Sequence, residues 1–469
     1  MIMEKRNSFS GSIGFVLAAA GSAVGLGNIW RFPYLAAKDG GGLFLAVYLV
    51  LALTFGFTLL VTEVSIGRKT KQGCLTAYGK MKKGWGWLGG FASLVPFLIL
   101  PYYCIIGGWV LKYAIVFITG IGIDGVATDG FFSDFISSPF APIILTAVFL
   151  AATCFVVFRG INKGIESMSK ILMPILLLLV LGISIFSVFI KGNDSTQGRS
   201  GIDGLLVYVV PSFEGVDGTR FLTIVLDAMG QLFYSISVAM GIMVTYGSYF
   251  KDKDNLMRSV NQIEIFDTVV AFLAGVMIIP AVYVFSGSEG MTASGPGLMF
   301  MTLPKVFAEM GIAGRIVGAV FFLMVLFAAL TSSVSILEAV ASGIMDKTHI
   351  SRKKTVVIEG VIALILGIII CFGYNKDLLF FNIKLPNGAD AQLLDIFDYA
   401  SNNILMPIVA IGTCILVGWV TKPKAIIDEA TKNGERFGRK YLYIGMVKVV
   451  APLMLAMLLL VSLGILKLN

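Results

Sequence analysis

The sequence predicts an all-α polytopic membrane protein with eleven transmembrane helices, and three observations support this fold class. The chain has 469 residues, of which 57% are hydrophobic and only 14% are charged. Apolar runs long enough to cross a bilayer recur from one end to the other. Of the lysines and arginines between these runs, 24 fall on the side of the N-terminus and nine on the opposite side. This asymmetry predicts a cell (plasma) membrane protein with a cytoplasmic N-terminus and an extracytoplasmic C-terminus.

The predicted spans are joined mostly by short polar connections. They cover residues 12–36, 42–66, 87–118, 141–158, 168–190, 221–250, 260–285, 313–345, 355–373, 393–420 and 441–466. We expect five units along the chain: a cytoplasmic segment (1–11), a first five-span repeat (12–190), an outer loop (191–220), a second five-span repeat (221–420), and a cytoplasmic loop with the eleventh span (421–469).

The first span contains a stretch that disfavours helix, GSAVGLGNIWRFP at residues 21–33. Its glycines weaken a helix, and Asn28 and Arg31 are polar near the depth where a span is driest. Gly21 and Gly25 also form a GxxxG pattern, so a helix-packing face is the alternative. Because polar residues and a proline accompany the glycines, we favour an interrupted helix. Unwound carbonyls at membrane depth can bind a small cation.

The sixth span resembles the first in kind. It reads AMGQLFYSISVAMGIMVTYGSYF over residues 228–250, with Ser235, Ser237 and Gly241 near its middle. Two interrupted spans, five apart, predict a five-plus-five inverted repeat, and the eleventh span then lies outside the repeat.

The eighth span carries FAALTSSVSILE at residues 327–338. Serine and threonine in such helices usually bond to their own backbone carbonyls. Together with unwound carbonyls of the first span, however, Thr331 and Ser332 can complete a cage of neutral oxygen atoms. Such a cage suits sodium, because divalent ions normally draw carboxylates.

Several other function classes find little support. The net charge of +8 comes mostly from basic loops between spans, so topology explains it better than nucleic-acid binding. The single histidine, His349, lies in a charged loop, and the five cysteines include no CxxC pair. We therefore expect no enzyme, and an intramembrane enzyme would need a nucleophile with a base or paired metal ligands. Asp267 and Glu63 lie deep in predicted spans, where a carboxylate needs a partner or a proton.

Five motifs together resemble the neurotransmitter:sodium symporter family, in its bacterial amino-acid branch. They are residues 21–33, PYYCIIGGW (101–109), GQLFYSISVAMG (230–241), LTSS (330–333) and LLDIFDYA (393–400). The resemblance implies sodium-coupled symport by alternating access, with an amino acid and two sodium ions as the small-molecule ligands. Interrupted helices of this kind typify the family. Apart from the lipid bilayer, no obligate protein partner and no nucleic acid is expected.

The resemblance also implies the site residues. One sodium site would use Gly21, Val24, Ala328, Thr331 and Ser332. The other would use Ala23, Asn28, Ser235 and Asp267, with the substrate carboxylate as a shared ligand. The substrate pocket would be lined by Ser22, Ala23, Leu26, Gly27, Ile99, Tyr103, Tyr234, Ser235, Ser237, Ala239, Met240, Ser332 and Ile336. Arg31 and Asp398 would form an outer gate above Tyr103 and Tyr234. Arg6 and Asp346 would form an inner gate, aided by Phe9, Ser248 and Tyr249.

Two departures from the family pattern refine this expectation. Asp267 stands where many relatives have Asn, near the positions Tyr48, Gln231 and Ser235 that lie beside chloride in chloride-dependent members. A carboxylate there supplies the negative charge, so we expect chloride-independent transport, with Asp267 as the candidate carrier of a counter-transported proton. Gly25 replaces the acidic residue of monoamine carriers, which favours a zwitterion over an amine.

The pocket itself is apolar, which predicts a neutral, mainly hydrophobic L-amino acid. We expect Ala239 to narrow it and Met240 to allow breadth. Two alternatives stay open: an ion channel, which would need repeated pore-lining segments or rings of charge, and a sodium symporter of another small zwitterion.

Overall fold

The computed structural model describes residues 8–192, 196, 198–291 and 295–467. In that part of the chain, nine helical segments are long and apolar enough to cross a membrane. A tenth crossing is a broken pair, Ser12–Ala23 and Gly27–Lys38, bent by 51°. Counting α11 (Gly218–Ser235) and α12 (Ile242–Ser248) as a second interrupted span gives a number consistent with the predicted eleven. The protein is thus a polytopic helical membrane protein.

The spans of the first half begin with α1 (Ser12–Ala23), the π-helical turn η1 (Gly27–Arg31) and α2 (Phe32–Lys38). The second span joins α3 (Gly42–Leu51), η2 (Ala52–Gly56) and α4 (Phe57–Thr70). The next three are α6 (Gly86–Thr119), α8 (Ala141–Phe158), and η4 (Ile161–Glu166) with α9 (Ser167–Val188). The fifth span therefore begins several residues before its predicted start.

In the second half, α11 and α12 are followed by α13 (Leu256–Gly290), α16 (Gly311–Thr348) and α17 (Arg352–Phe372). The tenth span joins α18 (Leu393–Asp398), η7 (Tyr399–Leu405), α19 (Met406–Ile415) and η8 (Leu416–Val420). The last joins α21 (Lys440–Gly445), η9 (Met446–Val450) and α22 (Ala451–Ser462).

Short elements fill the connections. They are α5 (Cys74–Met81), η3 (Ile123–Gly125), α7 (Gly130–Ser137), α10 (Gly201–Val209), α14 (Gly295–Gly297), η6 (Leu298–Thr302), α15 (Leu303–Glu309) and α20 (Lys424–Ala430). The strands β1 (Ile383–Lys384) and β2 (Asp390–Ala391) pair antiparallel, with Ile383 opposite Ala391. Helix α10 lies in the segment 191–220 that was expected to be a loop, and a Ser200–Asp203 capping box starts it.

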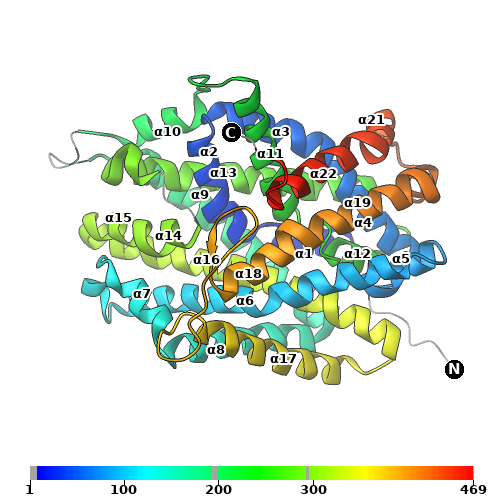
Figure 1. The fold of residues 1–469 in the computed structure, drawn as a ribbon, viewed down its shortest axis with the longest axis horizontal. Helices are drawn as coiled ribbons and strands as arrows, with labels where there is room; N and C mark the ends of the chain where they lie inside the picture. The colour runs from blue at the N-terminus through cyan, green and yellow to red at the C-terminus, as the bar shows by residue number, and fades with distance from the viewer. Residues whose placement is uncertain (1–7, 193–195, 197, 292–294, 468–469) are drawn as a thin grey trace.

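The interrupted spans lie at the centre of the bundle. Helix α1 contacts α9, α13 and α16, while α6 packs against α8 and α16, and α8 against α17 (Figure 1). Nine of the twelve residues of α1 are buried. The backbone groups freed at its end therefore face protein instead of lipid, as an interruption at membrane depth requires.

Close approach and backbone geometry explain where the two helices break. Val24 is extended (ψ 91°), which ends α1. A Cβ on Gly27 would lie 2.9 Å from Tyr234 of the sixth span, so only glycine allows the two broken helices to meet there. In the sixth span, Ser237, Ala239 and Gly241 have left-handed backbones (φ 54°, 61° and 71°), a conformation that cannot continue an α-helix.

Candidate functional site

A narrow cavity of about 20 Å³ lies where the two interrupted spans cross. Twelve of the thirteen predicted substrate residues line it: Ser22, Ala23, Leu26, Gly27, Ile99, Tyr103, Tyr234, Ser235, Ser237, Met240, Ser332 and Ile336. Gly25, Asn28 and Ile242 complete the wall. None of these side chains is acidic or basic.

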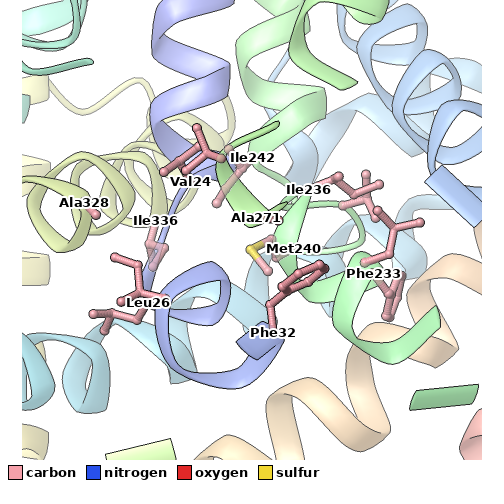
Figure 2. Packing of buried hydrophobic residues seen from close by; sticks show 14 of the residues in the cluster. Val24, Leu26, Phe32, Phe233, Ile236, Met240, Ile242, Ala271, Ala328 and Ile336 are labelled. Atoms are coloured by element: carbon pink, nitrogen blue, oxygen red, sulfur yellow. The ribbon is translucent and has the colours of Figure 1, made fainter. Parts of the chain in front are cut away.

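Apolar side chains from different spans face this crossing point. Figure 2 shows Leu26 of the first span, Met240 of the sixth and Ile336 of α16 gathered around the break in the helices. Ile242 was missed from the sequence as a wall residue, although its position, first in the helix after the break, was the available signal.

Ala239 does not line the cavity, contrary to the prediction. Its backbone N–H donates to Oε1 of the buried Glu63 at 2.6 Å. Its backbone is left-handed, with a φ of 61°. The Glu63 carboxylate thus acts as a hydrogen-bond acceptor for the unwound segment, a role that the sequence did not reveal.

A first cluster of oxygen atoms surrounds Asp267, which is fully buried. The Asn28 amide donates to Ser235 Oγ and to Asp267 Oδ1, both at 2.9 Å. Ser235 donates to the same carboxylate oxygen at 2.6 Å, and Tyr48 to the other at 3.3 Å. Gln231 lies beside the cluster, where its amide donates to the Gly27 carbonyl at 3.0 Å. Asn28, Ser235 and Asp267 are therefore joined in one hydrogen-bond network. They are three of the four residues predicted for the sodium site that shares the substrate carboxylate, and the fourth, Ala23, lines the adjoining cavity wall.

A second cluster lies between the end of α1 and the middle of α16. Ser332 Oγ donates to the carbonyls of Gly21 at 3.4 Å and Ser22 at 3.2 Å. Thr331 Oγ1 donates to the Ala328 carbonyl at 3.1 Å. A Cβ on Gly21 would lie 3.3 Å from the Thr331 side chain, so the two helices touch here. These oxygen atoms are neutral, and the cluster holds no carboxylate of the kind that divalent cations normally draw.

Tyr103 supplies a free polar group in the wall. Its hydroxyl is buried and has no hydrogen-bond partner among the described residues. A buried hydroxyl left without a partner costs free energy, and a ligand carboxylate or amine can satisfy it.

Comparison with known proteins decides the family. The family model described as "Sodium:neurotransmitter symporter family" matches residues 6–121 and 139–468. The chain belongs to this family. It is therefore a sodium-coupled transporter and not an enzyme.

Similar proteins match 90% or more of the chain. The uncharacterized sodium-dependent transporter YhdH of Bacillus subtilis is 32% identical, with 100% of both chains covered. The human sodium- and chloride-dependent GABA transporter 2 is 26% identical, over 90% of this chain and 74% of its own length. The crystal structure of MhsT in complex with L-phenylalanine is similar with a TM-score of 0.84 and 32% identity, covering 98% of this chain and 100% of MhsT.

The predicted outer gate of this symporter is not a direct ion pair in the described structure. Asp398 instead accepts a hydrogen bond from Asn402 at 2.6 Å. Tyr103 and Tyr234 both line the cavity beneath them, but the described aromatic contacts do not include a stacked pair of these two rings.

The predicted inner gate is described in part, because Arg6 lies outside the described residues. Phe9 is buried, and its N–H donates to the Tyr249 carbonyl at 3.3 Å. Tyr249 donates its hydroxyl to Glu338 at 2.6 Å, and Glu338 pairs with Arg352. Asp346 accepts from the Gly73 N–H at 2.6 Å, and Ser248 donates to the Thr245 carbonyl at 2.5 Å. The Glu338–Arg352 pair was missed from the sequence.

Proposed function

We propose that this protein is a sodium-coupled symporter of neutral, mainly hydrophobic L-amino acids that works by alternating access. One observation carries the proposal: the cavity wall combines apolar and neutral polar groups, holds no charged side chain, and adjoins two clusters of oxygen atoms. A zwitterion matches this wall, since its charged ends meet backbone and hydroxyl groups while its side chain meets Leu26, Met240 and Ile336. The complex of the similar protein MhsT with L-phenylalanine supports the same class of substrate.

The coupling of ion and substrate follows from the position of the Asp267 cluster. Asn28 and Ser235 belong both to this cluster and to the cavity wall. A sodium ion held there would meet the substrate carboxylate directly, so each ligand would raise the affinity for the other. A second ion would bind at Gly21, Val24, Ala328, Thr331 and Ser332. We thus propose two sodium sites per chain.

Chloride independence is a separate proposal. The buried Asp267 already places a negative charge beside Tyr48 and Ser235. An added anion at this point would be repelled in a medium of low dielectric constant. Asp267 would also be the group that carries a proton back after sodium and substrate are released. The plasma membrane, with the N-terminus inside, remains the proposed location.

The test is uptake of radiolabelled amino acids into proteoliposomes that contain the purified protein. An inward sodium gradient should drive accumulation, and replacement of sodium by choline should abolish it. Unlabelled leucine, methionine or phenylalanine should compete, whereas lysine, aspartate and a zwitterion such as betaine should not. Equal accumulation in choline would refute coupling, and competition by betaine alone would favour the other class of zwitterion.

A matched pair of serines sharpens this test. Ser332 bonds to α1 carbonyls, while the adjacent buried Ser333 bonds to the Leu330 carbonyl and to Thr153 on another helix. Ser332→Ala should raise the sodium concentration for half-maximal uptake about tenfold, the equivalent of one lost ligand contact. Ser333→Ala should leave it within about twofold.

A further inference from the structure

An apolar groove of about 450 Å³ runs along α8 and α17, apart from the substrate cavity. Its eleven lining residues all come from these two helices, and apart from the Cys154 thiol they are hydrocarbon side chains or glycine. The two helices lie side by side at the lower edge of the bundle in Figure 1. Phe155 and Val361, both in the wall, are 60% and 52% exposed in the protein alone, so this face meets the hydrocarbon of the bilayer.

Gly360 makes the groove deep at its middle. A Cβ added there would lie 2.8 Å from Cys154 Sγ, and no other atom lies within 4 Å of it. The helices therefore approach closely at this point, with space remaining on the outer side. An acyl chain fits such a channel because it is narrow, apolar and open along its length.

Two cations stand at one end of the groove. The Arg159 guanidinium lies 5.5 Å from the ring centre of Phe155, and the Lys353 ammonium lies 5.2 Å from that of Phe158. Both rings belong to the groove wall. Arg159 follows the last residue of α8 and Lys353 is the second residue of α17, and a hydrogen bond from Arg352 to the Val157 carbonyl at 3.5 Å holds these helix ends together.

These cations are available to a ligand. Within the described chain, neither Arg159 nor Lys353 forms an ion pair, whereas the adjacent Arg352 is paired with Glu338. A basic pocket between transmembrane helices at the membrane surface is the chemistry that recognises an anionic lipid headgroup. Guanidinium and ammonium groups form charge-assisted hydrogen bonds to phosphate oxygens.

We propose that this groove, formed by α8 and α17, binds an anionic phospholipid. One acyl chain lies between Phe155 and Val361, and the phosphate lies between Arg159 and Lys353. A zwitterionic lipid binds less well, because its own ammonium group is repelled by the two unpaired cations. The site is independent of the proposed substrate, so failure of one proposal leaves the other standing.

The experiment measures binding of phosphatidylglycerol and phosphatidylcholine to the full-length purified protein by native mass spectrometry, with thermal unfolding in detergent as a second readout. We expect one phosphatidylglycerol to bind at least tenfold more tightly than phosphatidylcholine and to raise the unfolding temperature. The double variant Arg159→Ala with Lys353→Ala should lose about thirtyfold in phosphatidylglycerol affinity. Lys69→Ala with Lys83→Ala removes two exposed lysines elsewhere and should keep the affinity.

A second pair of variants tests the groove without changing charge. Ala151 lines the groove, whereas the exposed neighbour Ala152 does not. Ala151→Trp should fill the space and reduce phosphatidylglycerol binding, and Ala152→Trp should not. Equal phosphatidylglycerol affinity in all four variants would overturn the proposal. So would a dimer that Ala151→Trp dissociates with no effect on lipid binding, because a second copy of the chain would then occupy the groove.

Discussion

At the scale of single residues, the decisive group is the carboxylate of Asp267. It is completely buried and receives hydrogen bonds from an amide and two hydroxyls, with no basic side chain among its described partners. A buried carboxylate without a countercharge is unfavourable unless a cation or a proton neutralises it. Asp267 is therefore the residue at which we expect the ion dependence of transport to be decided.

Asp267→Asn tests this connection. Removal of the charge should make uptake depend on chloride, because an anion can then take the place of the carboxylate beside Tyr48 and Ser235. Uptake by the variant in proteoliposomes should fall at least tenfold when gluconate replaces chloride, while the wild type changes less than twofold. Asp203→Asn, at an exposed helix start, serves as the control. A variant that transports equally well in both anions would contradict the assignment.

At the scale of elements, the two interrupted spans meet at positions where the backbone is unusual. Ala239 adopts a left-handed conformation that costs a residue with a Cβ roughly 1–2 kcal/mol. Its bond to Glu63 offsets this cost and fixes the direction of the unwound segment. In this segment Ser237 and Met240 line the cavity wall.

Substitutions at these adjacent positions should therefore have different effects. Ala239→Gly should stabilise the folded protein by about 1 kcal/mol, since glycine adopts this conformation without strain, and should leave the ranking of substrates unchanged. Met240→Ala should enlarge the cavity and shift preference toward bulkier side chains. Thermal unfolding and a competition panel measure the two effects. A changed substrate ranking in Ala239→Gly would contradict this prediction, because it would indicate that residue 239 contacts the substrate.

The end of α2 and the helix α11 are linked by ion pairs. Lys38, the last residue of α2, pairs with Asp227 of α11 at 2.8 Å. Arg220 of α11 pairs with Asp39, the residue after α2, at 2.8 Å. Burial raises the pKa of the Asp39 carboxyl from its usual 3.8 to about 6, and the nearby Asp227 carboxylate adds to the rise. The stability of the folded protein therefore depends on pH through the Asp39 carboxyl.

The sign of that sensitivity follows from linkage. The folded protein binds the Asp39 proton more tightly than the unfolded chain, so the contribution of this proton to the free energy of unfolding is complete below about pH 4 and is lost as the pH rises through about 6. The difference in unfolding temperature between wild type and Asp39→Asn should therefore decrease between pH 4 and 6.5 and stay level above. Asp203→Asn should show no trend in this window, because hydrogen bonds from Ser200 lower the pKa of Asp203. A constant difference for Asp39→Asn would contradict the raised pKa of Asp39.

At the scale of the whole molecule, the sequence predicted the spans well because membrane-length hydrophobic runs are a direct physical requirement. The oxygen clusters followed from the resemblance, since Asn28, Ser235 and Thr331 stand at motif positions. The left-handed backbone of Ala239 could not be predicted, because the residue bonds to Glu63, which lies 176 residues away in the sequence. Helix α10 was missed because glycines and serines dominate its surroundings.

The central claim is that the interrupted spans hold sodium and the amino acid in one shared site. Equilibrium binding of a radiolabelled neutral amino acid to the purified protein, titrated with sodium at constant ionic strength, tests it most directly. We predict that sodium raises the amino-acid affinity at least tenfold, and that the amino acid raises the sodium affinity by the same factor. The same affinity in sodium and in choline would contradict the account.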